Sequence, residues 1–213
     1  MPTSESQRIA RLQQIFSSRS DRVLRGIGDD ASVVRSDGVI VTSVDALVDG
    51  VHFERSYASP RAIGHKAAAS ALSDLAAMGV AAGEIYIAAG LPADFTDEDF
   101  DELARGIEQV AADTGATASG GDLTASPVLW LSVTAVGHAA SEADVIARDG
   151  ARAGDLIAVT GTLGGSAAGL ELLRGSPALA EIGDTLTGRL RERHLLPRPR
   201  FAAGRALATS GAT

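Results

Sequence analysis

The chain has 213 residues, with 27 acidic against 19 basic side chains and a formal net charge of −8. This balance disfavours nucleic-acid binding, because affinity for a polyanion needs clustered cations and the arginines here are scattered among acids. The absence of cysteine excludes thiolate zinc sites, cysteine nucleophiles and disulfides. No apolar run predicts a membrane span or a secretory signal, so we expect a soluble, cytoplasmic protein.

Helices and strands alternate along the first 140 residues. Ser4 and Gln7 are spaced as a capping box, which predicts a helix over residues 4–18. Further strands are expected over 39–44, 84–89, 117–119 and 128–137, and further helices over 59–78 and 96–113. In chain order these elements predict an α/β (α+β) fold, in which a mixed β-sheet has helices packed on it.

A boundary is expected near residues 139–144, followed by the start of a second α/β domain. This part predicts a strand over 155–160 and helices over 167–174, 185–194 and 200–209. The intervening turn, Gly161–Ser166, is rich in glycine but has no lysine. We therefore favour plain turn geometry there over anion binding at a helix N-terminus.

Four aspartates stand in settings that are unusual for carboxylates. Asp74 is the only charged residue of the apolar stretch 67–83, which predicts that it is buried in a helix. Asp45 and Asp122 are equally isolated among uncharged residues, and Asp30 follows a glycine turn. One such aspartate would most simply cap a helix or hold a loop. Four of them without histidine or cysteine favour Mg²⁺, whose coordination a phosphate-bearing substrate would complete.

A run of acids over residues 94–102 is a weaker metal candidate. It falls in the first turn of a predicted helix, where carboxylates complement the positive end of the helix dipole. We interpret it as a solvated helix start.

Several segments resemble the thiamine-monophosphate kinase family in order and in spacing. They are Gly26–Ala31 (GIGDDA), Ser43–Val48 (SVDALV), Val51–Phe53 (VHF), Leu72–Gly79 (LSDLAAMG), Gly120–Asp122 (GGD), Arg148–Ala151 (RDGA) and Val159–Gly164 (VTGTLG). The combination of GIGDD with LSDLAAMG is the specific part, whereas GGD alone would carry little weight.

The resemblance implies an ATP-dependent kinase of the aminoimidazole ribonucleotide synthetase-like superfamily, a homodimer paired through its amino-terminal sheets. Its reaction moves the γ-phosphoryl group of ATP onto thiamine monophosphate and gives thiamine diphosphate. On matching positions it implies Mg²⁺ ligands at Asp30, Ser43, Val44, Asp45, Asp74 and Asp122, ATP contacts at Gly121, Asp122 and Arg148, and a substrate contact at His52.

No catalytic side chain is assigned, because the acceptor phosphate is already ionised and the metal supplies charge neutralisation. Val44 stands where the family usually has threonine, so only its backbone carbonyl could serve as a ligand. Arg148 could instead pair with Asp149 or Asp144 on a loop surface, and His52 could be a plain hydrogen-bonded loop residue.

The resemblance also implies a division of labour between two domains. Residues 1–140 would bind metal and ATP and form the dimer, and residues 141–213 would be an incomplete carboxy-terminal domain, because family members continue past this length. The activity of the 213-residue chain itself stays open. Two alternatives remain, namely a non-catalytic Mg-nucleotide-binding dimerisation module and a related ATP-dependent synthetase.

Overall fold

The centre of the molecule is a four-stranded mixed sheet. The computed structural model describes residues 4–28, 31–179 and 181–212. The strands are β3 (Val39–Val48), β4 (Ala81–Leu91), β5 (Thr117–Ala125) and β6 (Trp130–Ala139), in the spatial order β3-β6-β4-β5. Strands β4 and β5 run parallel, and β6 is antiparallel to both of its neighbours. The predicted mixed sheet is therefore confirmed.

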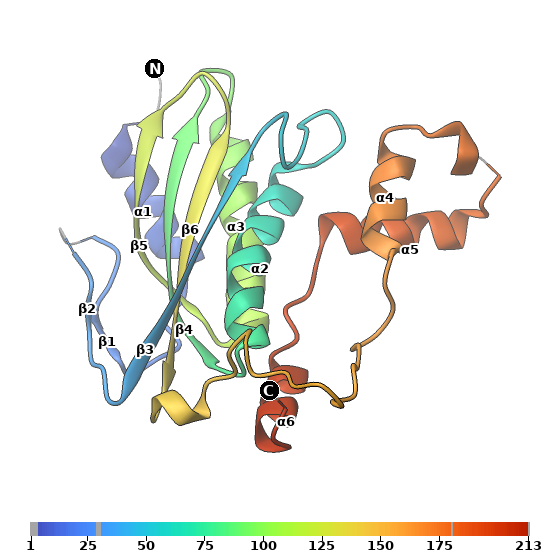
Figure 1. Cartoon of the computed structure of the whole chain (residues 1–213). Helices are drawn as coiled ribbons and strands as arrows, with labels where there is room; N and C mark the ends of the chain where they lie inside the picture. Colours follow the sequence, from blue (N-terminus) through green and yellow to red (C-terminus); the bar gives the residue numbers. More distant parts are fainter. Residues whose placement is uncertain (1–3, 29–30, 180, 213) are drawn as a thin grey trace.

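Two long helices, α2 (Pro60–Ala77) and α3 (Asp97–Thr114), cover one face of this sheet (Figure 1). Both begin as predicted, with Ser59 and Thr96 as N-caps. Few aromatics are needed in the core, because the two helices approach closely. A Cβ at Gly106 of α3 would overlap the carbonyl oxygen of Arg61 on α2. The alanines of α2 and the Val, Leu and Ile residues of the strands then fill the remaining space.

The amino-terminal segment adds a helix and a small hairpin. Helix α1 (Glu5–Ile15) has the predicted capping box between Ser4 and Gln7. The hairpin of β1 (Val23–Arg25) and β2 (Val33–Val34) was not expected from the sequence. Strand β3 continues past Asp45 to Val48, farther than predicted, because β6 pairs with it along its whole length.

After β6 the chain leaves the sheet. It passes through the short helix η1 (Glu142–Asp144) to α4 (Gly165–Leu173), η2 (Pro177–Leu179), α5 (Asp184–Leu195) and α6 (Phe201–Thr209). The three predicted helices of this part are confirmed. In Figure 1, α4 and α5 lie to the side of the sheet and α6 lies at the end of α2. We call residues 4–139 the body and residues 140–212 the arm.

The predicted strand over 155–160 is wrong. These residues belong to no strand, and the side chains of Leu156 and Ile157 are 97% and 98% exposed. A strand needs a neighbour to complete its hydrogen-bond ladder, and no strand in the described ranges pairs with this segment. The apolar run alone was therefore not sufficient to form one.

No helix within the described residues combines the length and the apolar composition that crossing a membrane requires.

Candidate functional site

Strand β3 and helix α2 bring three polar side chains together. Side chains alternate between the faces of a strand, so Ser43 and Asp45 lie on the same face of β3, the one that packs against α2. The hydroxyl of Ser43 donates to Oδ2 of Asp74 on α2 at 2.5 Å. Burial raises the pKa of Asp45, and the negative charge of Asp74 raises it further. We call Ser43, Asp45 and Asp74 the carboxylate cluster. Two carboxylates that repel each other form a place where a cation would be favourable.

Asp74 itself is not buried, so that expectation is wrong. Helix α2 buries most of its residues, but Ser73 and Asp74 are exposed. The reason is that β3 is the outermost strand of the sheet, so solvent reaches the side of α2 that meets it. An exposed carboxylate can exchange a metal ion with solvent, which a sealed one could not.

Two further predicted ligands stand apart from this cluster. The side chain of Val44 lies on the opposite face of β3 and is 62% exposed, so only its main chain runs beside the cluster. Asp30 lies outside the residues that the structure describes.

His52 lies in the loop that follows β3, close enough to Asp45 that a positive charge on its imidazole would lower the pKa of that carboxyl. The Val48 N–H donates to His52 Nδ1 at 3.1 Å. The neutral imidazole must then carry its proton on Nε2, because Nδ1 acts as the acceptor. His52 is exposed and therefore offers an N–H donor next to the carboxylate cluster.

A cavity of about 810 Å³ opens at the opposite edge of the sheet, beside β5, and its volume is within the range of small-molecule sites. Its walls come from α1, α3, β4, β5 and the glycine turn 26–28, and Gly121 and Asp122 lie in its lining. The glycine turn is fixed by α1, because the Gln13 amide donates to the carbonyl oxygen of Ile27 at 2.8 Å. Two of the predicted ATP contacts thus face a cavity of suitable size.

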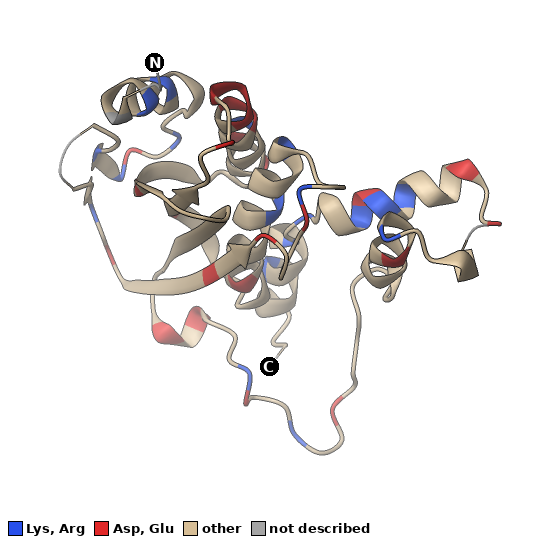
Figure 2. Cartoon of the chain, turned by 90° about the horizontal axis from the view of Figure 1, so that it is seen from above, with Lys and Arg blue, Asp and Glu red and all other residues tan. Residues whose placement is uncertain are grey.

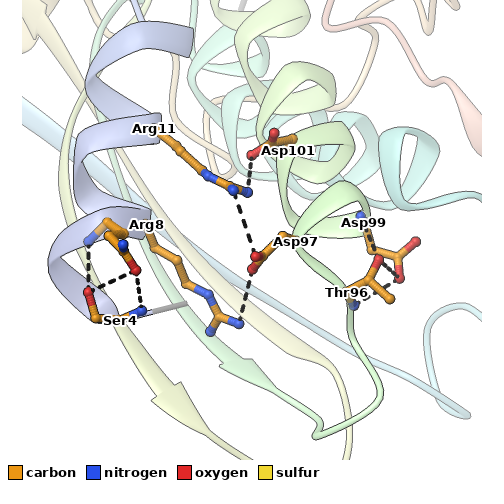
Figure 3. A network of polar contacts seen from close by, with 8 residues as sticks. Ser4, Arg8, Arg11, Thr96, Asp97, Asp99 and Asp101 are labelled. Atoms are coloured by element: carbon orange, nitrogen blue, oxygen red, sulfur yellow. Dashed lines mark hydrogen bonds and ion pairs between the residues drawn. The ribbon is translucent and has the colours of Figure 1, made fainter. Parts of the chain in front are cut away.

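The acidic start of α3 holds the α1 wall of this cavity in place (Figure 3). Arg8 and Arg11 of α1 both reach Asp97 at 3.7 Å, and Arg11 reaches Asp101 at 3.5 Å. Figure 2 shows acids gathered at the start of this helix. The structure thus gives these carboxylates ion-pairing partners, in addition to the helix dipole.

Asp122 and the carboxylate cluster lie far apart within one chain. Strands β5 and β3 form opposite edges of the sheet, with β4 and β6 between them. Three strand spacings correspond to about 14 Å. Among the described residues, no three Asp, Glu or His side chains gather closely enough to form a metal site. The structure thus presents two half-sites, a carboxylate edge at β3 and a cavity edge at β5.

Arg148 belongs to neither half-site. It lies exposed on the connection between β6 and α4, and it has no ion pair with Asp144 or Asp149 in the part of the chain that the structure describes. Asp144 instead accepts hydrogen bonds from the N–H and the hydroxyl of Ser141. The surface ion pair that the sequence left open is therefore absent here.

Sequence reasoning missed Lys66 of α2, whose ammonium donates to the carbonyl oxygen of His52 at 3.2 Å. The sequence did contain an indication that this residue is unusual, because Lys66 is the only lysine among the 19 basic residues. It also lies two helical turns before Asp74 on the same helix.

Comparison with known proteins bears on this arrangement. The family model "AIR synthase related protein, N-terminal domain" matches residues 28–139, which is more than half of the chain. The chain belongs to this family. A thiamine-monophosphate kinase of Mycobacterium tuberculosis is 40% identical over 192 residues, which cover 89% of this chain and 55% of that protein.

Solved structures show the same similarity. The crystal structure of thiamine-monophosphate kinase from Stenotrophomonas maltophilia matches with a TM-score of 0.79 and 34% identity, over 96% of this chain and 63% of that one. The structure described as AaThiL complexed with AMPPCP and TMP matches with a TM-score of 0.73 and 33% identity, over 89% of this chain and 58% of that one. The chain thus spans little more than half the length of these relatives.

Proposed function

We propose that the protein is a thiamine-monophosphate kinase, which transfers the γ-phosphoryl group of ATP to thiamine monophosphate and forms thiamine diphosphate. The observation that carries this proposal is the carboxylate cluster beside His52. Paired carboxylates suit Mg²⁺, and an adjacent N–H donor suits a phosphate oxygen. The relatives that match the chain over most of its length carry this name.

In this proposal Asp45 and Asp74 hold Mg²⁺ through their carboxylates, with Ser43 and the main chain of Val44 beside them. Asp30 and Asp122 are proposed as ligands of further Mg²⁺ ions, because Asp122 lies about 14 Å from the carboxylate cluster within one chain. The ion, when bound, neutralises phosphate charge and brings donor and acceptor oxygens into line. His52 donates from Nε2 to the phosphate of thiamine monophosphate. No general base is required, because that phosphate is already ionised near neutral pH.

We assign the nucleotide to the cavity edge. Gly121 and Asp122 line the cavity, and the apolar residues of α1 and α3 provide a surface for a base and a sugar. Arg148 is proposed to contact the phosphates of ATP, since a guanidinium can bind two phosphate oxygens at once. It is exposed and unpaired within the described chain, so no ion pair has to break first.

The proposal includes a homodimer that pairs through the amino-terminal sheets. The face of β3 that points away from the helices exposes two large apolar side chains, Ile40 at 56% and Val44 at 62%. A partner that covers them would remove apolar area from water. Residues 1–140 would form the metal, ATP and dimer domain, and residues 141–213 part of a second domain. We place the enzyme in the cytoplasm, where its donor ATP is available.

The test is product formation. The purified chain, and any longer product of the same gene, is incubated with thiamine monophosphate, ATP and Mg²⁺, and thiamine diphosphate is measured. We expect product only when all three are present, and none when EDTA replaces Mg²⁺. Absence of product from the longer protein, although it binds both substrates, would rule out the kinase.

A second function is favoured by one observation. The cavity lining runs from Ser6 to Leu123, so nucleotide binding there does not need the arm. This function is a module that binds Mg-nucleotide and dimerises without turnover. In calorimetry such a module would give heat of binding for AMPPCP with Mg²⁺. The same protein would form no thiamine diphosphate from ATP and thiamine monophosphate.

A further inference from the structure

The only lysine of the chain lies at a junction of three helices. Lys66 of α2 is half-buried, and its ammonium donates to the carbonyl oxygen of His52 at 3.2 Å. The same ammonium lies 3.1 Å from Nε2 of His194 on α5. His194 is buried, and its Nδ1 lies 3.2 Å from both the hydroxyl and the carbonyl oxygen of Ser166 at the start of α4. The junction therefore connects the His52 loop to the arm.

The donors and acceptors of this junction fix the protonation of both groups. An ammonium has no acceptor, so His194 Nε2 must accept from Lys66. His194 is then neutral, and its proton sits on Nδ1, from which it donates to Ser166. Burial lowers the pKa of Lys66, and burial followed by the charge of Lys66 lowers the pKa of His194. The arrangement of one charged lysine and one neutral histidine satisfies every one of these contacts.

The His52 loop is held at two points. Its imidazole accepts from the Val48 N–H, and its carbonyl oxygen accepts from Lys66. The first contact lies within the body, whereas the second depends on where the ammonium is directed. His194 is the only other recorded partner of that ammonium among the described residues. Displacement of the arm would therefore free Lys66 to turn away from the loop.

We propose that Lys66 and His194 are positioning residues, which hold the His52 loop in place for the acceptor phosphate only while α5, with α4 packed on it, is docked against α2. This inference rests on the proposed function for the role of His52. It goes further because it makes acceptor binding, and not nucleotide binding, dependent on the arm. The nucleotide cavity lies at the opposite, β5 edge of the sheet, and neither Lys66 nor His194 belongs to its lining.

The first test separates the two substrates kinetically. Lys66→Met keeps the apolar stem and removes the ammonium, and His194→Phe keeps a ring and removes both nitrogens. We expect each variant to raise KM for thiamine monophosphate about tenfold, the loss expected for one hydrogen bond to a charged group, and to leave KM for ATP within about twofold. Arg61→Met is the matched control, because it removes a cation from the same helix at a site paired with Glu102. The control should leave both KM values unchanged.

Equal effects of Lys66→Met on both KM values, or no effect on either, would overturn the proposal. A general loss of structure would also raise both values together, and a melting curve identifies that case. His194→Gln serves as the milder variant if His194→Phe does not fold.

The second test does not require turnover. Because the chain has one lysine, protein labelled with ¹⁵N-lysine gives a single side-chain ammonium signal in NMR. We expect His194→Phe to shift this signal and also to shift the ring signals of His52, while Arg61→Met leaves both in place. An unchanged His52 signal in His194→Phe overturns the link between the arm and the loop. If the expected shifts are observed but wild-type protein makes no thiamine diphosphate, the kinase proposal fails. The coupling between the arm and the His52 loop then still stands.

Discussion

The body and the arm of this protein differ in how they bury apolar surface. In the body, two helices cover one face of a four-stranded sheet and enclose a continuous core. In the arm, Leu156, Ile157 and Leu163 are more than four-fifths exposed, and the main contacts with the body run through α2. The body thus contains its own stabilising core, whereas the arm relies on docking. All of the predicted site residues except Arg148 belong to the body.

The largest expected difference is in stability. Leu131 of β6 is fully buried beneath the helices, and Leu156 is almost fully exposed. Leu131→Ala should destabilise the chain by about 3 kcal/mol, whereas Leu156→Ala should change the free energy of unfolding by less than about 0.5 kcal/mol. Urea unfolding of both variants measures this. Equal losses would mean that the arm has a core of its own.

The next effect concerns activity without loss of fold. Asp74→Asn removes one charge from the carboxylate cluster but keeps the shape of the side chain. We expect turnover of thiamine monophosphate to fall on the order of 100-fold, because the proposed Mg²⁺ site would lose a ligand. The exposed position of Asp74 predicts an unchanged melting temperature. Asp113→Asn, on an exposed carboxylate of α3, is the control, and wild-type turnover in Asp74→Asn would contradict the metal role.

A smaller effect should follow from separating the arm from the body. Gly204 of α6 is buried against α2, and a Cβ there would overlap the carbonyl oxygen of Ala76. Gly204→Val should weaken this docking by roughly 1–3 kcal/mol. Hydrogen exchange would show it as lost protection in α6 with the sheet of the body still protected. Gly188→Val is the control for adding the same side chain, because Gly188 has open space around it. Loss of protection in β4 and β6 would refute the independence of the body.

The smallest effect is a pH dependence of the same docking. His65 on α2 bonds the carbonyl oxygen of Pro197, and His194 bonds Lys66, so both histidines join body and arm. Burial lowers the pKa of both, with Lys66 adding to the shift of His194. Their contribution to docking is present above the ordinary histidine pKa of about 6.5 and is lost as pH falls below it. Protection factors in α5 and α6, which correct for the slower intrinsic exchange at lower pH, should therefore fall from pH 7.5 to 5.5. Exchange in the arm that does not change relative to β6 would contradict this.

Local sequence signals predicted much of the body. The capping residues Ser59 and Thr96 marked the starts of the two long helices, and the order of apolar segments predicted the mixed sheet. What failed depended on partners distant in sequence. The extension of β3 comes from pairing with β6, and residues 155–160 form no strand because no described strand adjoins them.

The same limit applies to the candidate site. Isolation in sequence identified Asp45 and Asp74 as unusual, and the structure brings them together with Ser43. The burial of Asp74 was predicted wrongly, because an apolar stretch with one charged residue does not reveal that its helix meets an edge strand of the sheet. The separation of Asp122 from the cluster depends on strand order, which no local pattern encodes.

The most direct measurement follows the phosphoryl group itself. ATP labelled with ³²P in the γ position is incubated with the protein, Mg²⁺ and thiamine monophosphate, and the products are separated. We predict that the label appears in thiamine diphosphate in an amount equal to the ADP formed, and that Asp74→Asn lowers this transfer on the order of 100-fold. Label found only in free phosphate, or ATP consumed without any thiamine diphosphate, would contradict the assignment as a kinase.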